Sequence, residues 1–246
     1  MEYQNALVTG ASSGIGRGLA TWLARRGIRV YAVARRLENL EALKAEAGDK
    51  IIPIKLDCSD GDATEARVRE LDAQSGGLDL VVANAGIAEE SIGKRIAWKP
   101  IEQMLKVNVL GATATLCGAL PGMVERKRGH LVGISSIAAY GGLPRLGAYS
   151  GTKAYLATFL QGLRLDVQKL GITVSCIHPG YVKSEMTTDL KNPPFLMETA
   201  DAVEHIGRAI LRGAESYTFP WQMGVGMKTL ASLPRPLFEA ALKKMR

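Results

Sequence analysis

A tyrosine and a lysine spaced four residues apart are side chains of types that could move a proton. Tyr149 and Lys153 are the first and last residues of the segment Tyr149-Ser-Gly-Thr-Lys153. Residues four apart share one face of a helix. A phenol has an ordinary pKa of about 10, but a nearby ammonium group favours its ionised form. Ser136 precedes this pair and could donate a hydrogen bond to an oxygen that gains negative charge. The three residues are therefore candidates for acid–base chemistry, although the Tyr–Lys spacing alone discriminates little.

A glycine-rich turn follows the first apolar run and opens a helical segment, in the order Thr9-Gly-Ala-Ser-Ser-Gly-Ile-Gly16. Gly10 would permit a tight exit from a strand, Gly14 would let the backbone approach a pyrophosphate, and Gly16 would let the helix pack closely on the sheet. The helix N-terminus adds free N–H groups and a positive dipole end. We therefore expect a dinucleotide to contact this turn, including Ser12, Ser13 and Ile15. A generic strand-to-helix turn is the alternative.

The end of the second strand indicates which nicotinamide cofactor is bound. Val33-Ala-Arg-Arg36 stands where an NAD enzyme places an acidic residue against the ribose 2′-hydroxyl. Ala34 leaves room for a 2′-phosphate, and Arg35 and Arg36 could hold it through charge-assisted hydrogen bonds. We predict NADP(H) in preference to NAD(H), with Arg35 favoured over Arg36. The alternative is that both arginines are a solvated start of the next helix.

Apolar runs alternate with helix-period segments along the whole chain. We expect strands at residues 6–9, 30–34, 51–55, 80–83, 130–135, 173–178 and 217–219. Helices are expected at residues 15–26, 37–47, 64–74, 101–116, 149–170 and 201–213. Continuous apolar strands joined by helices are typical of a parallel sheet covered on both faces. The fold class is therefore α/β, a doubly wound Rossmann-like sheet of about seven strands.

The organisation is that of one dinucleotide-binding domain spanning residues 1–246. Its least regular parts are residues 183–198, which contain Asn192-Pro-Pro194, and a basic amphipathic tail at residues 220–246. The longest uncharged run, residues 107–124, contains Asn108 and several glycines and threonines. We expect that run to form a core or interface helix rather than a membrane span.

At this point the chain resembles the short-chain dehydrogenase/reductase family over essentially its whole length. The matching positions, in order, are Thr9 to Gly16, Asp57, Asn84-Ala85-Gly86, Asn108, Ser135-Ser136, Tyr149 with Lys153, and Pro179-Gly180. The resemblance implies a catalytic tetrad of Asn108, Ser136, Tyr149 and Lys153. In the family pattern the tyrosine is the general acid or base, the lysine bonds the nicotinamide ribose, and the asparagine holds a water that connects the lysine to solvent.

The resemblance also implies how the cofactor lies. Asp57 and Cys58 would border the adenine, and Asn84, Ala85 and Gly86 would support the adenosine ribose and the central sheet. The nicotinamide would be lined by Pro179, Gly180, Val182 and Ser184. Two positions depart from the family pattern. Ser184 replaces a threonine but keeps its hydroxyl, whereas Ser13 replaces a basic residue of many NADP-preferring members and so weakens the prediction of NADP(H).

Substrate contacts are expected from residues 137–146, Tyr181 and residues 183–198, where Phe195-Leu-Met197 is apolar. A hydrophobic carbonyl or alcohol substrate would suit these residues, although the segment could equally pack on a neighbouring helix. The basic tail has two interpretations as well. It packs over the substrate cleft or against a second subunit, or, less favoured, it contacts an anionic membrane surface.

The composition is that of an ordinary globular protein, with 47% hydrophobic and 22% charged residues among 246. The net charge of +7 suits an anionic partner. Five basic residues and one acidic residue lie in residues 217–246, so most of the charge excess belongs to the tail. No helix-turn-helix or aromatic-basic RNA motif is present in the sequence, so we expect no nucleic-acid partner.

Cysteine and histidine usage points away from disulfides and metals. Cys58, Cys117 and Cys176 have no CxxC spacing, and the chain start lacks the basic region of a signal peptide. We therefore expect a cytoplasmic protein without a metal site. The histidines at 130, 178 and 205 are expected to be structural.

Two classes of function remain at this stage. The first is an NADP(H)-dependent oxidoreductase that acts on a carbonyl or secondary alcohol, and the second is a dinucleotide-binding sensor or signalling protein of the same fold. A complete tetrad favours the enzyme. The family resemblance implies a homodimer or homotetramer through helices near residues 108–123 and 150–168.

Overall fold

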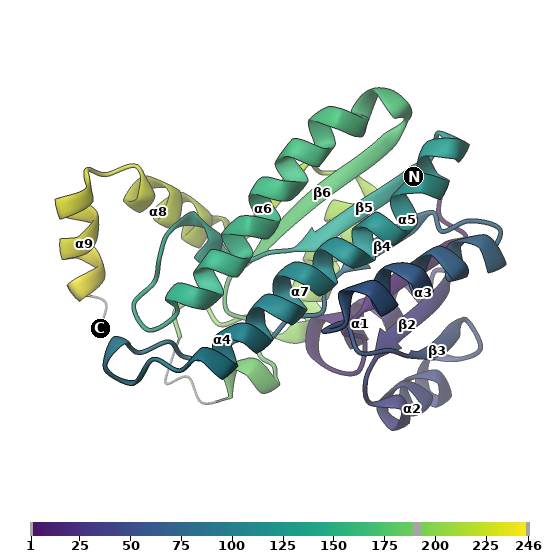
Figure 1. Cartoon of the computed structure of the whole chain (residues 1–246), viewed down its shortest axis with the longest axis horizontal. Helices are drawn as coiled ribbons and strands as arrows, with labels where there is room; N and C mark the ends of the chain where they lie inside the picture. The colour runs from purple at the N-terminus through teal and green to yellow at the C-terminus, as the bar shows by residue number, and fades with distance from the viewer. Residues whose placement is uncertain (1, 189–192, 245–246) are drawn as a thin grey trace.

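The computed structural model describes residues 2–188 and 193–244 and has a seven-stranded parallel sheet at its centre (Figure 1). The strand order is β3-β2-β1-β4-β5-β6-β7, which confirms the doubly wound α/β prediction. The strands are β1 Asn5–Thr9, β2 Arg29–Ala34, β3 Ile51–Lys55, β4 Leu80–Ala83, β5 Gly129–Ile134, β6 Ile172–Pro179 and β7 Ser216–Phe219.

Helices cover both faces of the sheet because successive strand residues point to opposite sides. Ala6 and Val8 of β1 pack on one face, against α1 (Gly14–Ala24), α2 (Leu37–Ala47) and α7 (Thr199–Leu211). Leu7, between them, packs on the other face with α3 (Gly61–Gln74), α5 (Ala112–Arg126) and α6 (Gly147–Val167). Both faces are therefore buried, which explains the uninterrupted apolar runs of the strands.

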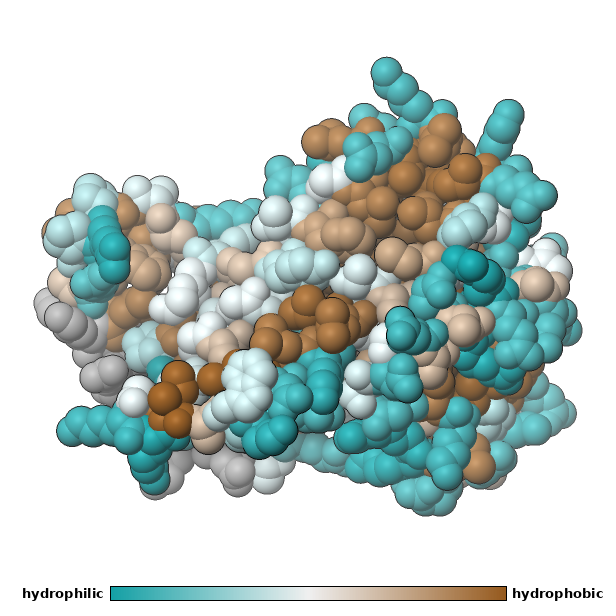
Figure 2. Space-filling view, viewed as in Figure 1, coloured by the Kyte–Doolittle hydropathy of each residue, from teal (hydrophilic) through white to brown (hydrophobic). Residues whose placement is uncertain are grey.

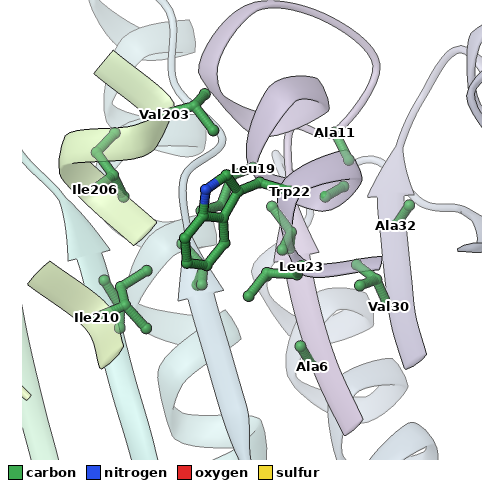
Figure 3. Packing of buried hydrophobic residues seen from close by; sticks show 14 of the residues in the cluster. Ala6, Ala11, Leu19, Trp22, Leu23, Val30, Ala32, Val203, Ile206 and Ile210 are labelled. Atoms are coloured by element: carbon green, nitrogen blue, oxygen red, sulfur yellow. The ribbon is translucent and has the colours of Figure 1, made fainter. Parts of the chain in front are cut away.

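The contact between α1 and α7 fixes the helix that begins at the glycine turn. Figure 3 shows the indole of Trp22 lying between α1 and the side chains of Val203, Ile206 and Ile210 on α7. The Trp22 Nε1 also donates a hydrogen bond of 2.6 Å to a carboxylate oxygen of Glu204. This packing fixes α1 against α7 on one face of the sheet.

The long apolar run forms a composite helix. It comprises α4 (Trp98–Leu105), a π-helical stretch η2 (Lys106–Gly111) and α5. By length and composition Trp98–Arg126 could cross a membrane. Half of its most apolar 18-residue stretch, however, is buried inside the protein. Helix α5 packs on α3 and on the sheet, as expected for a core helix.

The chain after β7 is more regular than predicted. It forms two helices, α8 (Trp221–Ala231) and α9 (Arg235–Lys244), which lie together at one end of the molecule (Figure 1, yellow). Met227 and Leu242 are buried, and the Phe238 ring packs against Gly141. The apolar residues of this tail thus cover part of the body of the protein.

Four short helices complete the described parts of the chain: η1 Gly93–Arg95, η3 Ile137–Tyr140, η4 Gln168–Leu170 and η5 Glu185–Thr187. The predicted irregular segment, residues 183–198, contains η5 and is closed by a β-bridge between Val182 and Met197. Asn192 of this segment lies outside the described residues.

Candidate active site

The sheet order reverses between β1 and β4, and a crevice at such a point is where open α/β sheets bind ligands. The predicted site residues follow the carboxyl ends of four strands around it. The glycine turn follows β1, Asn84 follows β4, Ser136 follows β5, and Gly180 follows β6. The topology therefore gathers segments that are far apart in the sequence at one edge of the sheet.

The glycine turn has the geometry of a phosphate cradle. Gly10 and Gly14 have φ angles of +68° and +53°, which favour glycine. A Cβ on Gly16 would lie 2.3 Å from the Gly10 carbonyl oxygen, so no larger residue fits there. Asn84 Nδ2 donates to the Thr9 carbonyl at 2.8 Å and ties the turn to β4. The open backbone and the helix N-terminus that it begins fit a pyrophosphate.

The arginines after β2 differ in their contacts. Arg36 donates to the hydroxyl oxygens of both Ser12 and Ser13 at 3.1 Å, so its guanidinium lies against the glycine turn. It also pairs with Glu185 of η5 at 3.3 Å. Both arginines are exposed. Arg36 is the arginine that contacts the turn, while the preference for Arg35 as the phosphate ligand stays a prediction.

Cys58 is a buried thiol and not an exposed nucleophile. Burial, and to a smaller extent the Asp57 carboxylate, raises the pKa of Cys58 to about 11. The Cys58 carbonyl also abuts Gly111, where an added Cβ would be 2.0 Å from it. Packing therefore accounts for this residue, while the neighbouring Asp57 remains exposed and accepts a hydrogen bond from the Ser59 N–H at 2.9 Å.

Lys153 is buried on the inner face of α6 and has 4% of its surface exposed. Its Nζ donates to the carbonyl oxygen of Ile134 at 2.9 Å and lies 5.8 Å from the centroid of the Tyr149 ring. Burial lowers the pKa of Lys153 to about 8, an effect that the Cys176 thiol partly opposes. The helix thus brings the tyrosine and the lysine to one face, as their spacing predicts.

Tyr149 and Ser136 are also brought together. Burial raises the pKa of the Tyr149 phenol, and a hydrogen bond with the Ser136 side chain lowers it. In the chain alone burial has the larger effect, so the pKa of Tyr149 is raised, and the lowering expected from Lys153 and a bound nicotinamide stays a prediction. Ser136 is the N-cap of η3, and its hydroxyl oxygen accepts a hydrogen bond from the Ala138 N–H at 3.1 Å.

Asn108 lies in the π-helical stretch and bonds to protein groups on both sides. Its Oδ1 accepts from the Ile87 N–H and its Nδ2 donates to the Ile87 carbonyl, both at 2.8 Å. Nδ2 also lies 3.1 Å from the Thr152 hydroxyl on α6. The side chain thus links the loop that follows Gly86 to the helix that carries Tyr149.

The remaining predicted contacts lie on the β6 side of the crevice. A Cβ on Gly14 would be 3.4 Å from the Ser184 Cβ, so Ser184 faces the glycine turn. Val182 is buried in the core, whereas Phe195 and Leu196 are exposed, and their contact with a substrate stays a prediction. Sequence reasoning gave no individual site role to Glu185, Met223 and Phe238, and it expected the buried His178 to be structural. Met223 and Phe238 pack against Gly180 and Gly141, and only the tail's apolar pattern hinted at such contacts.

The histidines take structural contacts. His130 lies between the hydroxyls of Tyr3 and Ser175, each at 2.7 Å, and His205 bonds to Tyr217 at 2.8 Å. Within the described residues, no group of three or more His, Cys, Asp or Glu could hold a metal ion.

Comparison with known proteins gives a consistent result. A family model described as short chain dehydrogenase matches residues 4–194. An uncharacterized oxidoreductase of Myxococcus xanthus is 54% identical over 250 residues, covering 100% of this chain and 99% of that protein. Serine 3-dehydrogenase of Agrobacterium fabrum is 38% identical over 184 residues, covering 74% of this chain and 73% of that protein.

Solved structures show the same likeness. A short-chain dehydrogenase from Sphingobium yanoikuyae in complex with NADPH superposes with a TM-score of 0.80 at 26% identity, covering 94% of this chain and 97% of that one. The closed form of a serine dehydrogenase complexed with NADP+ has a TM-score of 0.79 at 27% identity, covering 88% and 94%.

Proposed function

This chain belongs to the short-chain dehydrogenase/reductase family and is an oxidoreductase, and we propose that it transfers hydride between NADP(H) and a carbonyl or secondary-alcohol substrate. The observation that carries the proposal is the convergence of Ser136, Tyr149 and Lys153 beside a glycine turn with no room for a larger residue at Gly16. A sensor that binds a dinucleotide without turnover would not need this set of side chains.

The proposal gives a distinct task to each of four residues, Asn108, Ser136, Tyr149 and Lys153. The bound nicotinamide supplies or accepts the hydride. Tyr149 gives its phenol proton to the substrate oxygen during reduction and takes it back during oxidation. The Ser136 hydroxyl donates a hydrogen bond to the same oxygen while negative charge grows there. Lys153 holds a positive charge near the phenol and would bond the nicotinamide ribose, and Asn108 keeps the loop and helix α6 in register.

Ala34, Arg35 and Arg36 support NADP(H) as the preferred cofactor. Arg36 is held at Ser12 and Ser13 of the glycine turn by hydrogen bonds, and Ala34 carries no carboxylate that would repel a 2′-phosphate. Fluorescence titration with NADPH and with NADH tests the preference. We expect Arg36→Ser to weaken NADPH binding about 10-fold or more, since a charge-assisted hydrogen bond contributes about 1.5–3 kcal/mol, and to leave NADH binding almost unchanged. Equal losses for both cofactors would contradict the preference.

A hydrophobic substrate is supported by the apolar side chains on the substrate side. Met223 packs on Gly180 and Phe238 packs on Gly141. Phe195 and Leu196, in the predicted substrate segment, are exposed. We expect the rate of NADPH oxidation to rise with the apolar size of a carbonyl substrate. The panel should include the oxidation of L-serine, because of the serine dehydrogenase relatives. A rate independent of chain length would contradict the hydrophobic substrate.

Tyr149→Phe tests the mechanism directly. The variant lacks the phenol proton and should lose about 100-fold or more in turnover, the usual contribution of a positioned acid or base. Tyr155→Phe is the matched control, because Tyr155 lies on the same helix, is 40% exposed and bonds to Thr113 instead of Ser136. Turnover by Tyr149→Phe equal to that of Tyr155→Phe would refute the assigned role.

We extend the proposal to a cytoplasmic homodimer or homotetramer. Figure 2 shows apolar residues gathered over α6 and its surroundings. Tyr155 and Leu165 of α6 and Leu110 of η2 are exposed apolar side chains. Exposed apolar area of this kind is typical of a subunit contact. Sedimentation should give a mass above one chain, and Leu165→Glu should lower it; a monomeric wild type contradicts the proposal.

A further inference from the structure

His178 is a buried residue of β6 to which the mechanism above assigns no task. It has 4% of its surface exposed and immediately precedes Pro179. Its Nδ1 lies 3.4 Å from the carbonyl oxygen of Ser136. Burial lowers the pKa of His178 to about 4, so the ring is neutral near pH 7. A neutral imidazole carries one ring proton, and a hydrogen bond to a carbonyl requires that proton on Nδ1.

A second contact joins His178 to the far end of η3. Its ring stacks on Tyr140 with 5.0 Å between ring centroids and 26° between planes. The Tyr140 hydroxyl lies 2.6 Å from the Thr218 hydroxyl of β7, and Lys228 of α8 lies 5.1 Å from the Tyr140 ring centroid. Since Ser136 is the N-cap of η3 and Tyr140 is its last residue, one imidazole contacts both ends of the turn that follows the serine.

The orientation of the Ser136 hydroxyl depends on that turn. Its oxygen accepts the Ala138 N–H at 3.1 Å and lies 3.5 Å from the Pro179 carbonyl oxygen. We propose that His178 is a positioning residue that holds η3 so that the Ser136 hydroxyl stays within hydrogen-bond reach of the Tyr149 phenol. The inference rests on the proposed function for its catalytic consequence, and on geometry alone for the position of Ser136.

The charges around Tyr149 and His178 determine whether the pKa of Tyr149 can report a movement of Ser136. Tyr149 faces Ser136 from η3 and Lys153 from its own helix, Lys153 faces Cys176 from β6, and His178 faces Lys228 from α8. Because His178 is neutral, replacing it removes a donor and a stacking surface but no charge. A change in the pKa of Tyr149 would therefore report movement of Ser136, whose hydrogen bond lowers that pKa.

His178→Leu and His178→Asn separate the donor from general packing. Asn places an amide N–H near the position of Nδ1, whereas Leu fills the space without a donor. With NADPH and the best carbonyl of the panel, we expect kcat to fall about 10-fold in His178→Leu, as for one lost hydrogen bond, and to stay within about 3-fold in His178→Asn, with KM little changed in both. His205→Leu is the control, since His205 also stacks on an aromatic ring but does not contact Ser136.

An assay without turnover separates this inference from the proposed function. The resonance of 13Cζ-labelled Tyr149, assigned by its loss in Tyr149→Phe, reports the phenol pKa in the cofactor-free protein. We expect His178→Leu to raise that pKa by about 0.5, and His178→Asn and His205→Leu to leave it unchanged. A wild-type chain inactive on every substrate would refute the proposed function but not this shift.

Chemical rescue of a third variant, His178→Gly, gives an independent test of the inference. A hollow of about 390 Å³ is lined by His178, Tyr140 and Lys228 among others, so free imidazole has room to reach the gap left in His178→Gly. Added imidazole should restore kcat several-fold in His178→Gly and not in Tyr149→Phe. The inference is overturned if His178→Leu keeps the wild-type kcat and phenol pKa, if His178→Asn loses as much as His178→Leu, or if imidazole fails to rescue His178→Gly.

Discussion

Replacing Lys153 by methionine should make the cofactor-free protein more stable while it removes activity. Lys153 is buried, and burial lowers its pKa from 10.5 to about 8. Keeping the ammonium charged inside the folded protein at pH 7 therefore costs about 3 kcal/mol relative to the unfolded chain. The lost hydrogen bond to Ile134 offsets about 1 kcal/mol of the gain. We expect Lys153→Met to raise the free energy of unfolding by about 2 kcal/mol at pH 7.

The pH dependence identifies the cause of this gain. Because the folded pKa lies below the unfolded one, the folded protein holds fewer protons between about pH 8 and 10.5, and wild-type stability rises with pH in that window. Urea unfolding of both proteins should show their difference shrinking by about 2 kcal/mol from pH 7 to about pH 9.5. Lys169→Met, at an exposed lysine of η4, should change little at either pH. A Lys153→Met variant that is less stable at pH 7, with a difference independent of pH, would refute the reasoning.

Three further predictions concern other parts of the chain. Burial lowers the pKa of His130 and of His178 to about 4, so the unfolded chain takes up protons first and urea midpoints should fall as the pH drops from about 6.5 to about 4; a flat profile would contradict their burial as neutral groups. Gly16→Ala places a Cβ 2.3 Å from a turn carbonyl and should weaken NADPH binding about 10-fold or more by fluorescence titration, whereas Gly226→Ala, with open space around it, should not. Arg126→Met leaves a nearly buried carboxylate without its partner at 2.7 Å and should cost about 3 kcal/mol in urea unfolding, a loss that a surface pair would not show.

The sheet was predictable because its strands are apolar on both faces. The expected strands at residues 51–55 and 80–83 coincide with β3 and β4. The common direction of Tyr149 and Lys153 was also predictable. Once the segment is helical, four-residue spacing places both side chains on one face regardless of the surroundings. Local pattern therefore sufficed wherever a single element determined the outcome.

Features that depend on contacts between elements were not predictable. The raised pKa of Tyr149 follows from what covers the phenol, which no spacing in the sequence encodes. Arg36 was ranked below Arg35 because it stands one residue further from the strand, yet its contacts with Ser12 and Glu185 come from the turn and from η5. The tail was expected to be amphipathic and to be one of the least regular parts of the chain, whereas it forms the helices α8 and α9, with the Phe238 ring packed against Gly141.

The strand order has a consequence for how the chain acquires its structure during synthesis. Every neighbouring pair in the sheet is consecutive in the sequence except β1 with β4. When only β1, β2 and β3 have emerged from the ribosome, one edge of β1 has unpaired backbone groups, and Leu80–Ala83 must arrive before that edge is satisfied. The remaining strands then add outward from β4, one after another. The cofactor crevice lies at the junction of β1 with β4, so a nascent chain cannot hold a dinucleotide until its fourth strand has docked.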